Sequence, residues 1–320
     1  MNRKNDWRPW LIVAMLLSIS LVIAYQYVQH IEIPTVEARR QLQQSILDGN
    51  AESPYQYRVL VPYLTHGLEA TLKLIKPGDT FKLAYAIYDT LAIFASLTAL
   101  FYYLRNWFSQ SASLIGALIA AVSMLVGFRD HYYQPWSLLE PATIALGLHL
   151  IYHKKFGWLA GLIAISTLNR ETGIFLAAAY FFPWVLPNPF KTIRKEKWKD
   201  WLVGLALLLI WALIFWGLRL VLGEAPHVIT VKESLGISTQ PQNLLLALRQ
   251  WILFLGIFWL FIPLGFKAAP SFARKMAWLI PAYLVVILFY AIWFEVRLLM
   301  PLYPVLIPIG LAYLFPSETV

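Results

Sequence analysis

Long apolar runs separated by short polar connectors repeat along the chain from one end to the other. A helix that crosses the hydrocarbon core of a bilayer needs about 20 apolar residues, or fewer where it is broken or tilted. The pattern predicts about ten membrane-spanning helices, at residues 8–28, 82–104, 111–128, 137–152, 156–169, 172–187, 201–222, 250–266, 275–294 and 298–315. For the two short runs at 156–169 and 172–187, a single kinked or re-entrant element is an open alternative.

The basic connectors set the expected orientation. Lys191, Arg194, Lys195, Lys197 and Lys199 crowd one connector, and other short connectors such as 105–109, 153–155 and 267–275 also carry Lys or Arg. Because Lys and Arg favour cytoplasmic loops, these connectors and both termini are expected on the cytoplasmic side. The sequence thus predicts an all-α, multi-pass integral membrane protein in which residues 1–320 form a single transmembrane domain.

Two longer connectors, residues 30–81 and 223–249, then fall on the outer side. Within the first, residues 58–75 place Val59, Leu60, Tyr63, Leu64, Leu68, Leu72 and Ile75 at helical spacing, with polar residues between them. This pattern predicts an amphipathic helix in the membrane interface. An extramembrane helix packed on the bundle fits the same pattern.

Composition agrees with a membrane protein and excludes several classes of site. Hydrophobic residues make up 59% of the 320 residues and charged residues 13%, whereas a soluble domain carries about 25% charged residues. The chain contains no cysteine, so disulfides, zinc–thiolate sites and thiol nucleophiles are excluded. The formal charge of +9 comes from the cytoplasmic connectors, so we expect no nucleic acid partner.

Ionisable residues inside or beside the apolar runs are the strongest functional signal, because such groups are costly in a membrane unless they face protein or water. They are Arg58 before the interfacial helix, Asp89 in the second run, Asp130 and His131 after the third, Glu140 opening the fourth, Arg170 and Glu171 after the fifth, beside the polar Asn169, and Glu295 and Arg297 before the last. The predicted topology puts them on the outer side, where we expect them to share one cavity roofed by the first loop. Helix capping, local ion pairs and solvated turns are the structural alternatives.

Those side chains suit one reaction class. The sequence lacks the nucleotide-binding, zinc-protease and serine-hydrolase motifs, and no His and acid cluster has metal-ligand spacing. A carboxylate can act as a general base, and an Arg can stabilise a phosphate leaving group. Together they favour glycosyl transfer from a lipid-phosphate sugar, with no cofactor indicated and a divalent metal left open.

The run EVRLLMPLYPVLIP resembles the late-span motif His-Lys-Glu-x-Arg-Phe…Pro…Pro of the dolichol-phosphate-mannose-dependent mannosyltransferases. Glu295, Arg297 and the prolines match, whereas Trp293, Phe294 and Leu298 depart from the motif. The run from Trp136 to Glu140, the basic turn 153–155 and the stretch AGLIAISTLNRETGIFL are similar to bacterial relatives in the GT-C class of multispanning glycosyltransferases. In those relatives a cation follows the fifth span, where this chain has Arg170.

The resemblance implies a GT-C-like fold in the bacterial plasma membrane and a role in the cell envelope. The donor would be a polyprenyl-phosphate-linked sugar among the membrane lipids, and the acceptor a glycan, lipid or protein. The family places its presumed base in the first outer loop, where Glu32, Glu37, Asp48 and Glu52 are available. Asp48, Asp130 and Glu140 are the candidate catalytic carboxylates, with the other charged residues and Asn169 binding substrate.

Two other functions remain open. A transporter or flippase for a lipid-linked or anionic substrate would also need buried charges, although such proteins usually contain inverted repeats with broken helices, and the sequence shows no such symmetry. A non-catalytic scaffold subunit would use the paired charges to lock helices together.

Overall fold

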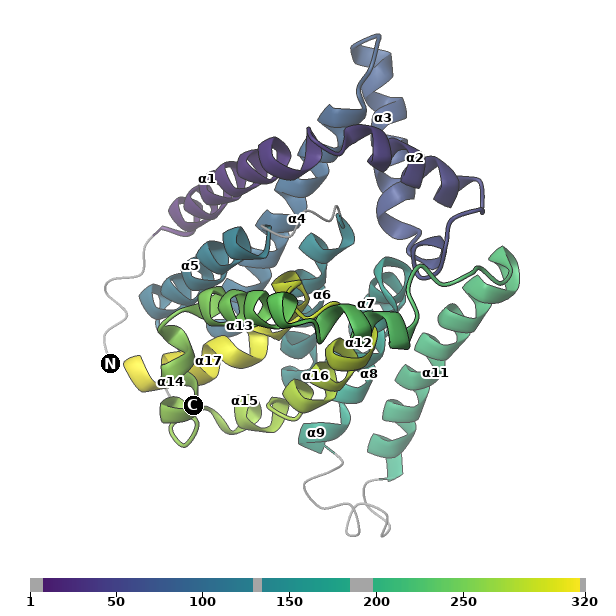
Figure 1. Ribbon diagram of the computed structural model, residues 1–320. Coiled ribbons are helices and arrows are strands. Elements are labelled where there is room, and N and C mark those ends of the chain that lie inside the picture. Colours follow the sequence, from purple (N-terminus) through teal and green to yellow (C-terminus); the bar gives the residue numbers. More distant parts are fainter. Residues whose placement is uncertain (1–7, 129–133, 185–197, 317–320) are drawn as a thin grey trace.

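The structure is a computed structural model that describes residues 8–128, 134–184 and 198–316. Every regular element in these ranges is a helix, apart from an isolated parallel bridge between Ser53 and His227. The helices pack into one bundle, and at its upper end lies the connector of residues 30–81, predicted to be outside and here named the first outer loop (Figure 1).

Six of the predicted apolar runs each form one continuous helix, with ends within three residues of those expected. These helices are α1 (Pro9–Tyr27), α4 (Phe81–Leu104), α5 (Gln110–Gly127), α6 (Trp136–Tyr152), α7 (Phe156–Asn169) and α11 (Trp198–Leu222).

The remaining runs are broken into shorter pieces. They form η3 (Glu171–Gly173), α8 (Ile174–Ala179) and α9 (Phe181–Trp184), then α13 (Pro241–Leu255) and α14 (Phe258–Gly265), then α15 (Ser271–Met276) and α16 (Leu279–Tyr290), and finally η4 (Val296–Leu302) and α17 (Tyr303–Leu314). Helices α13 and α14 meet at an angle of 70°. Run 156–169 thus forms one helix, α7, and the described part of run 172–187 is divided into η3, α8 and α9.

The length and apolar character of the helices support a membrane-embedded protein. Six stretches in the described ranges are long and apolar enough to cross a bilayer, namely Pro9–Glu32, Phe81–Leu104, Gln110–Gly127, Trp198–Leu222, Ser271–Tyr290 and Val296–Leu314. The bent pair α13 and α14 raises this to seven. These criteria do not reproduce the expected count of about ten, because runs such as 156–169 form helices too short to qualify.

The first outer loop is folded rather than extended. A π-helical turn, η1 (Val28–Glu32), continues α1, and α2 (Val36–Leu47), η2 (Tyr55–Tyr57) and α3 (Leu60–Ile75) follow. Helix α3 confirms the predicted amphipathic helix. Its Val61 and Thr65 are buried, whereas the apolar side chains of Leu64, Leu74 and Ile75 are exposed.

The second outer connector, residues 223–249, also contains helices. Thr230 and Glu233 cap the start of α12 (Val231–Ser238) with reciprocal hydrogen bonds, and α13 begins within the connector at Pro241. The connector is tied to the first loop, since the Ser53 amide donates to the Pro226 carbonyl over 2.8 Å and the Val228 amide to the Ser53 carbonyl over 2.9 Å.

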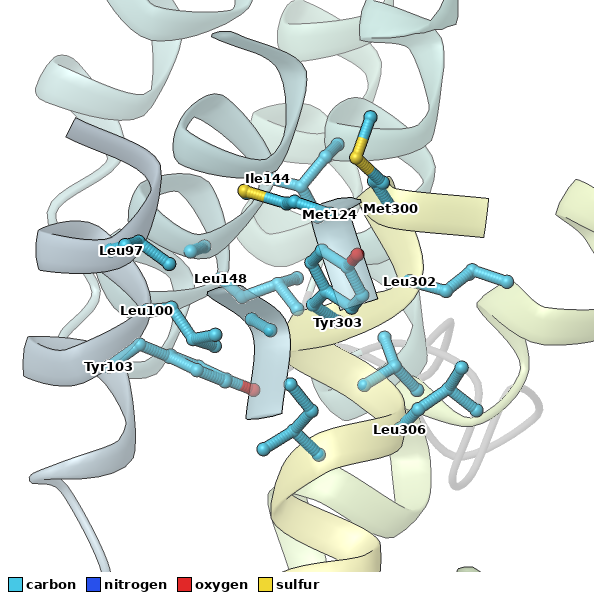
Figure 2. Packing of buried hydrophobic residues seen from close by; sticks show 14 of the residues in the cluster. Leu97, Leu100, Tyr103, Met124, Ile144, Leu148, Met300, Leu302, Tyr303 and Leu306 are labelled. Atoms are coloured by element: carbon cyan, nitrogen blue, oxygen red, sulfur yellow. The ribbon is translucent and has the colours of Figure 1, made fainter. Parts of the chain in front are cut away.

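The core lies where α4, α5, α6, η4 and α17 meet. Leu97 and Leu100 of α4 face Met124 of α5, Leu148 of α6 and Leu306 of α17 (Figure 2). By contrast, α11 exposes Leu209, Leu213 and Trp216. An apolar surface of this kind is stable against lipid and unstable in water.

Candidate functional site

Glu140 is the centre of a buried polar cluster. Its carboxylate accepts hydrogen bonds from Arg170 Nη1 over 2.6 Å, from Tyr283 Oη over 2.6 Å and from the Thr172 hydroxyl. Only 1% of Glu140 is exposed. Asn169 lies beside this cluster and donates from Nδ2 to the Trp136 carbonyl over 3.0 Å. Because the three bonds occupy the carboxylate, Glu140 is arranged to join α6, α7, η3 and α16 rather than to take a substrate proton.

Arg58 and Glu171 form a second ion pair next to the first. Arg58 donates from Nε to Glu171 Oε2 over 3.1 Å and from Nη2 to Oε1, and its guanidinium lies 5.6 Å from the Trp136 ring centroid. Burial alone would raise the pKa of Glu171, but the charge and hydrogen bonds of Arg58, with help from Arg170, lower it to about 2. This pair links the start of α3 to the turn after α7.

Glu32, Arg39 and Asp89 form a third cluster, beneath the first outer loop. Arg39 Nη2 lies 2.5 Å from Glu32 Oε1, and both side chains are 1% exposed. The carboxyl groups of Glu32 and Asp89 adjoin each other, and Asp89 has no exposed surface. The Arg39 guanidinium also stacks 4.4 Å from the Tyr85 ring centroid.

Of these three residues, the sequence pattern identified Asp89 as a site residue and Glu32 as a possible base, but it did not identify Arg39. The π-helical turn that ends at Glu32 could not be read from the sequence pattern, although such turns often occur at functional sites. Arg39 follows Glu32 by two helical turns, and it lies on the α2 face that holds the buried Gln43 and Ile46. The helical spacing from Arg39 to Gln43 and Ile46 is the sequence feature that could have identified Arg39 as a buried residue.

A large cavity opens between α2, η2 and the loop before α12. Its volume is about 550 Å³, and its lining consists of Thr35, Ala38, Arg39, Leu42, Ser45, Asn50, Ala51, Glu52, Tyr55 and Val228. Sites for small ligands usually have volumes of about 300–1,000 Å³. The cavity therefore combines a suitable size with the side chains of Arg39, Glu52 and Tyr55 in its wall, and the nitrogens of the Arg39 guanidinium are themselves buried.

Arg297 lies at a second, much smaller cavity. Its Nη2 pairs with Glu295 Oε2, so the local ion pair between these neighbours is present. The cavity is lined by Tyr27, Ile31, Gly127, Phe128, Gln134, Ser137, Leu138, Arg297 and Met300, and its roughly 10 Å³ of free space is enough for about one water molecule.

The two cavities are neighbours. Tyr27 lines the small one and lies within electrostatic range of Glu32, Arg39, Asp89 and Arg297. Gln134, also in the small cavity, donates from Nε2 to Oη of Tyr55 in the large one over 3.1 Å. The hydrogen bond between Gln134 and Tyr55 thus links the walls of the two cavities.

The structure brings together some of the predicted site residues and separates others. Arg58, Glu140, Asn169, Arg170 and Glu171 lie around Trp136, Asp89 is in the Arg39 cluster, and Glu295 and Arg297 are at the small cavity. The lining of the large cavity contains none of them, so the expectation of one cavity shared by all these residues is wrong. The reason is physical: Arg58, Arg170 and Arg297 each pair with a carboxylate of their own cluster, which avoids the cost of a buried unpaired charge.

The remaining predictions concern single residues. Asp48 is exposed at the end of α2, where it accepts from Gln44 Nε2 over 2.8 Å, and it does not line the large cavity. Asp130 and His131 lie outside the described residues. Within the described ranges, no three His, Asp or Glu side chains are close enough to hold a metal ion.

The large cavity is therefore the candidate site, with Arg39 and Glu52 as its charged residues. Comparison with known proteins adds nothing to this picture, since no family model, no curated protein and no solved structure matches the chain.

Proposed function

We propose that the chain is a membrane glycosyltransferase that moves a sugar from a polyprenyl-phosphate donor to an acceptor at the extracytoplasmic face. The observation that carries this proposal is that Arg39 and Glu52 line one cavity of about 550 Å³. A guanidinium can bind a phosphate group, and an accessible carboxylate can accept the proton of a hydroxyl group.

Glu52 is our assignment for the general base. Among the first-loop acids, it lines the cavity and is exposed, whereas Glu32 is buried against Arg39. In the reaction, the acceptor hydroxyl oxygen bonds to the anomeric carbon while the bond from that carbon to the phosphate oxygen breaks. The hydroxyl proton passes to the Glu52 carboxylate, and the polyprenyl phosphate leaves as an anion.

Arg39 is our assignment for the phosphate-binding residue. Its guanidinium would neutralise the negative charge that grows on the leaving phosphate. Glu32 fixes its position through the 2.5 Å contact, and the Tyr85 ring supports it from the side. These contacts hold the guanidinium in place before the substrate binds, so less reorganisation is needed when charge develops.

We further propose that the chain crosses the membrane about ten times, in a GT-C-like arrangement with both termini in the cytoplasm of a bacterial cell. The contacts between connectors support this. Trp107 packs against Tyr152 and Phe272, with ring centroids 5.1 and 5.9 Å apart, so three basic connectors meet at one end. The outer connectors meet at the other end, through Arg58 with Glu171 and Ser53 with Val228.

The test is a transfer assay with the purified full-length chain. A panel of synthetic short-chain polyprenyl-phosphate hexoses and pentoses is incubated with protein and membrane glycan or lipid acceptors, and loss of donor is followed. We expect Glu52→Gln to lower the rate about 100-fold or more, because a general base contributes about 10²–10⁴-fold. Glu37→Gln, an exposed acid on α2 outside the cavity lining, is the matched control and should retain the wild-type rate. Equal rates for wild type and Glu52→Gln would refute the assignment.

A transporter or flippase is the second candidate, and the 70° break between α13 and α14 favours it, since broken helices are common in transporters. Movement of a labelled lipid-linked sugar across proteoliposomes, with no covalent product, would establish that function instead. If the chain neither transfers nor transports, and the ion-pair variants lose only thermal stability, the scaffold function is correct.

A further inference from the structure

Two histidines meet at the end of α6, beside the connectors 105–109 and 153–155. His149 is partly buried in the last turn of the helix, and His153 is exposed at its C-cap. Residues four apart share one helix face, and the two ring centroids are 4.4 Å apart. A helix that presents two imidazoles in this way can hold a metal ion, as the H-E-x-x-H helix of zinc proteases does.

The side-chain amide of Asn106, just after α4, bonds to both rings. Its Nδ2 is 3.1 Å from Nδ1 of His149, and its Oδ1 is 2.9 Å from Nε2 of His153. A ring nitrogen forms its hydrogen bonds along the direction in which it coordinates a metal. One nitrogen of each ring is therefore directed at the same small volume, and an amide oxygen is present there as a third ligand atom.

The distance between the rings fits a metal ion whose neighbouring ligands stand at right angles. Bonds of about 2.0–2.1 Å from metal to nitrogen, with an angle of about 90° at the metal, place the centres of two bound imidazoles about 4.5 Å apart. The observed separation of 4.4 Å agrees with this value. Nitrogen and oxygen ligands at right angles are typical of Cu²⁺ and Ni²⁺ sites, and Cu²⁺ binds most tightly among the first-row divalent ions.

We propose that His149, His153 and Asn106 bind one divalent transition-metal ion, Cu²⁺ most tightly, through two imidazole nitrogens and the amide oxygen. Water completes the coordination. Rotation of the amide brings Oδ1 to the ion, and the bonds of Nδ2 to His149 and to the Tyr103 carbonyl, the latter over 2.7 Å, are exchanged for coordination. The ion joins the end of α4 to the end of α6.

The cations next to these residues in the sequence are directed to other partners. Arg105 donates from Nη1 to the Phe108 carbonyl over 2.9 Å, and Lys154 Nζ lies 4.4 Å from the Trp184 ring centroid. Lys155 is exposed to solvent. Two of the three charges are thus held by groups other than the histidine rings.

The proposed metal site goes beyond the proposed function and does not depend on it. It lies at the end of α4, whereas the first outer loop and the large cavity adjoin the start of that helix. The sequence pattern did not identify the site, because no acid accompanies the two histidines and Asn106 precedes His149 by 43 residues.

The experiment titrates the purified full-length chain, free of any histidine tag and stripped with a chelator, with Cu²⁺. For the wild type we expect one tightly bound ion per chain, with two nitrogen ligands in its electron paramagnetic resonance spectrum. Because a ligand that binds only the folded state stabilises it, Cu²⁺ should also raise the melting temperature.

His149→Ala and His153→Ala should each bind Cu²⁺ at least about tenfold more weakly, since loss of even an outer contact of a metal site costs about 10–100-fold in affinity. Each variant should also lose the second nitrogen ligand and the rise in melting temperature. Each is first shown to be folded by its melting temperature without metal, and the exposed position of His153 makes a folding defect there the smaller concern.

His66→Ala, which removes an exposed histidine from α3, is the matched control and should bind Cu²⁺ as the wild type does. Asn106→Asp should bind it more tightly, because a carboxylate oxygen attracts a cation more strongly than an amide oxygen. Equal affinity in the wild type and both His variants, or no rise in the melting temperature of the wild type with Cu²⁺, would overturn the inference. The three side chains would then join the helix ends by hydrogen bonds alone.

Discussion

At the scale of single residues, the buried pair Glu140 and Arg170 gives a sharp prediction about stability. Removal of one partner from a buried ion pair typically costs about 3–5 kcal/mol, because the other charge is left without compensation. We therefore expect Glu140→Leu to lower the melting temperature of the purified protein by many degrees. The double variant Glu140→Leu/Arg170→Leu should recover much of the loss, since no lone charge remains.

The control for this experiment is Glu37→Leu, which removes an exposed acid from α2 and should shift the melting temperature little. A double variant as unstable as Glu140→Leu alone would contradict the prediction. It would show that the hydrogen bonds of Glu140 to Thr172 and Tyr283, rather than charge balance, determine stability at this position.

The sequence identified most of the buried charges, yet it could not predict their partners. For Glu295 and Arg297 a local ion pair was one structural alternative to substrate binding, and the two side chains do pair with each other. Arg170 and Glu171 were expected to pair with each other if they were structural. Instead, Arg170 pairs with Glu140, 30 residues away, and Glu171 pairs with Arg58, 113 residues away. Such partners are set by how the helices pack, and no local pattern encodes that.

At the scale of elements, apolar length predicted where helices occur but not where they break. The run 250–266 is apolar on both sides of the 70° bend, so nothing in its hydrophobicity marks the bend. Gly256 adopts a φ of 54° at that bend, a conformation that glycine tolerates best. The helices within 223–249 were largely missed because that connector lacks a long apolar run, although the capping residues Thr230 and Glu233 were a visible signal.

The contact between α14 and α17 depends on two glycines. A Cβ atom on Gly265 would lie 2.1 Å from the Ile309 carbonyl oxygen, and one on Gly310 would lie 2.6 Å from the Phe258 ring. Small residues allow such close approach between helices in membranes. Gly265→Ala should therefore force the backbones apart and destabilise the protein by about 1–3 kcal/mol, measured as a lower melting temperature.

Gly161→Ala on α7 is the matched control, because a Cβ there meets no atom within 4 Å. It should leave the melting temperature unchanged or raise it slightly, since alanine is the better helix former by about 1 kcal/mol. An equal loss in both variants would mean that the α14–α17 contact is not specifically tight.

At the scale of the whole molecule, contacts between the helix ends indicate that successive helices alternate in direction. Phe156 at the start of α7 packs on Tyr180 after α8, with ring centroids 5.1 Å apart, so α7 and α8 run in opposite directions. At the other end of the bundle, the Ser234 hydroxyl donates to the Ala291 carbonyl over 2.7 Å, which joins the second outer connector to the end of α16. Helices such as α7 and α8 can therefore alternate in direction between the two ends of the bundle, although each is too short to be counted as a membrane span by its length.

Labelling of single introduced cysteines distinguishes a chain that crosses the membrane about ten times from one that crosses it six or seven times. The chain has no native cysteine, so no background reaction interferes. Lys76→Cys and Glu224→Cys lie in the outer connectors, and Lys155→Cys and Lys267→Cys lie in the inner ones; all four positions are exposed. With ten crossings, a membrane-impermeant maleimide applied to intact cells should label positions 76 and 224, whereas positions 155 and 267 should react only after permeabilisation.

Positions 155 and 224 separate the two topologies. If α6, α7 and the α8–α9 segment do not cross, the chain stays outside from the end of α5 to the start of α11. Position 155 would then react in intact cells and position 224 would not. That result would place Arg58 and the loop before α12 on opposite sides of the membrane, although Ser53 bonds to Pro226 and Val228. Because two hydrogen-bonded segments must share one side, we expect the alternating topology, and with it an outward cavity that Arg39 and Glu52 both line.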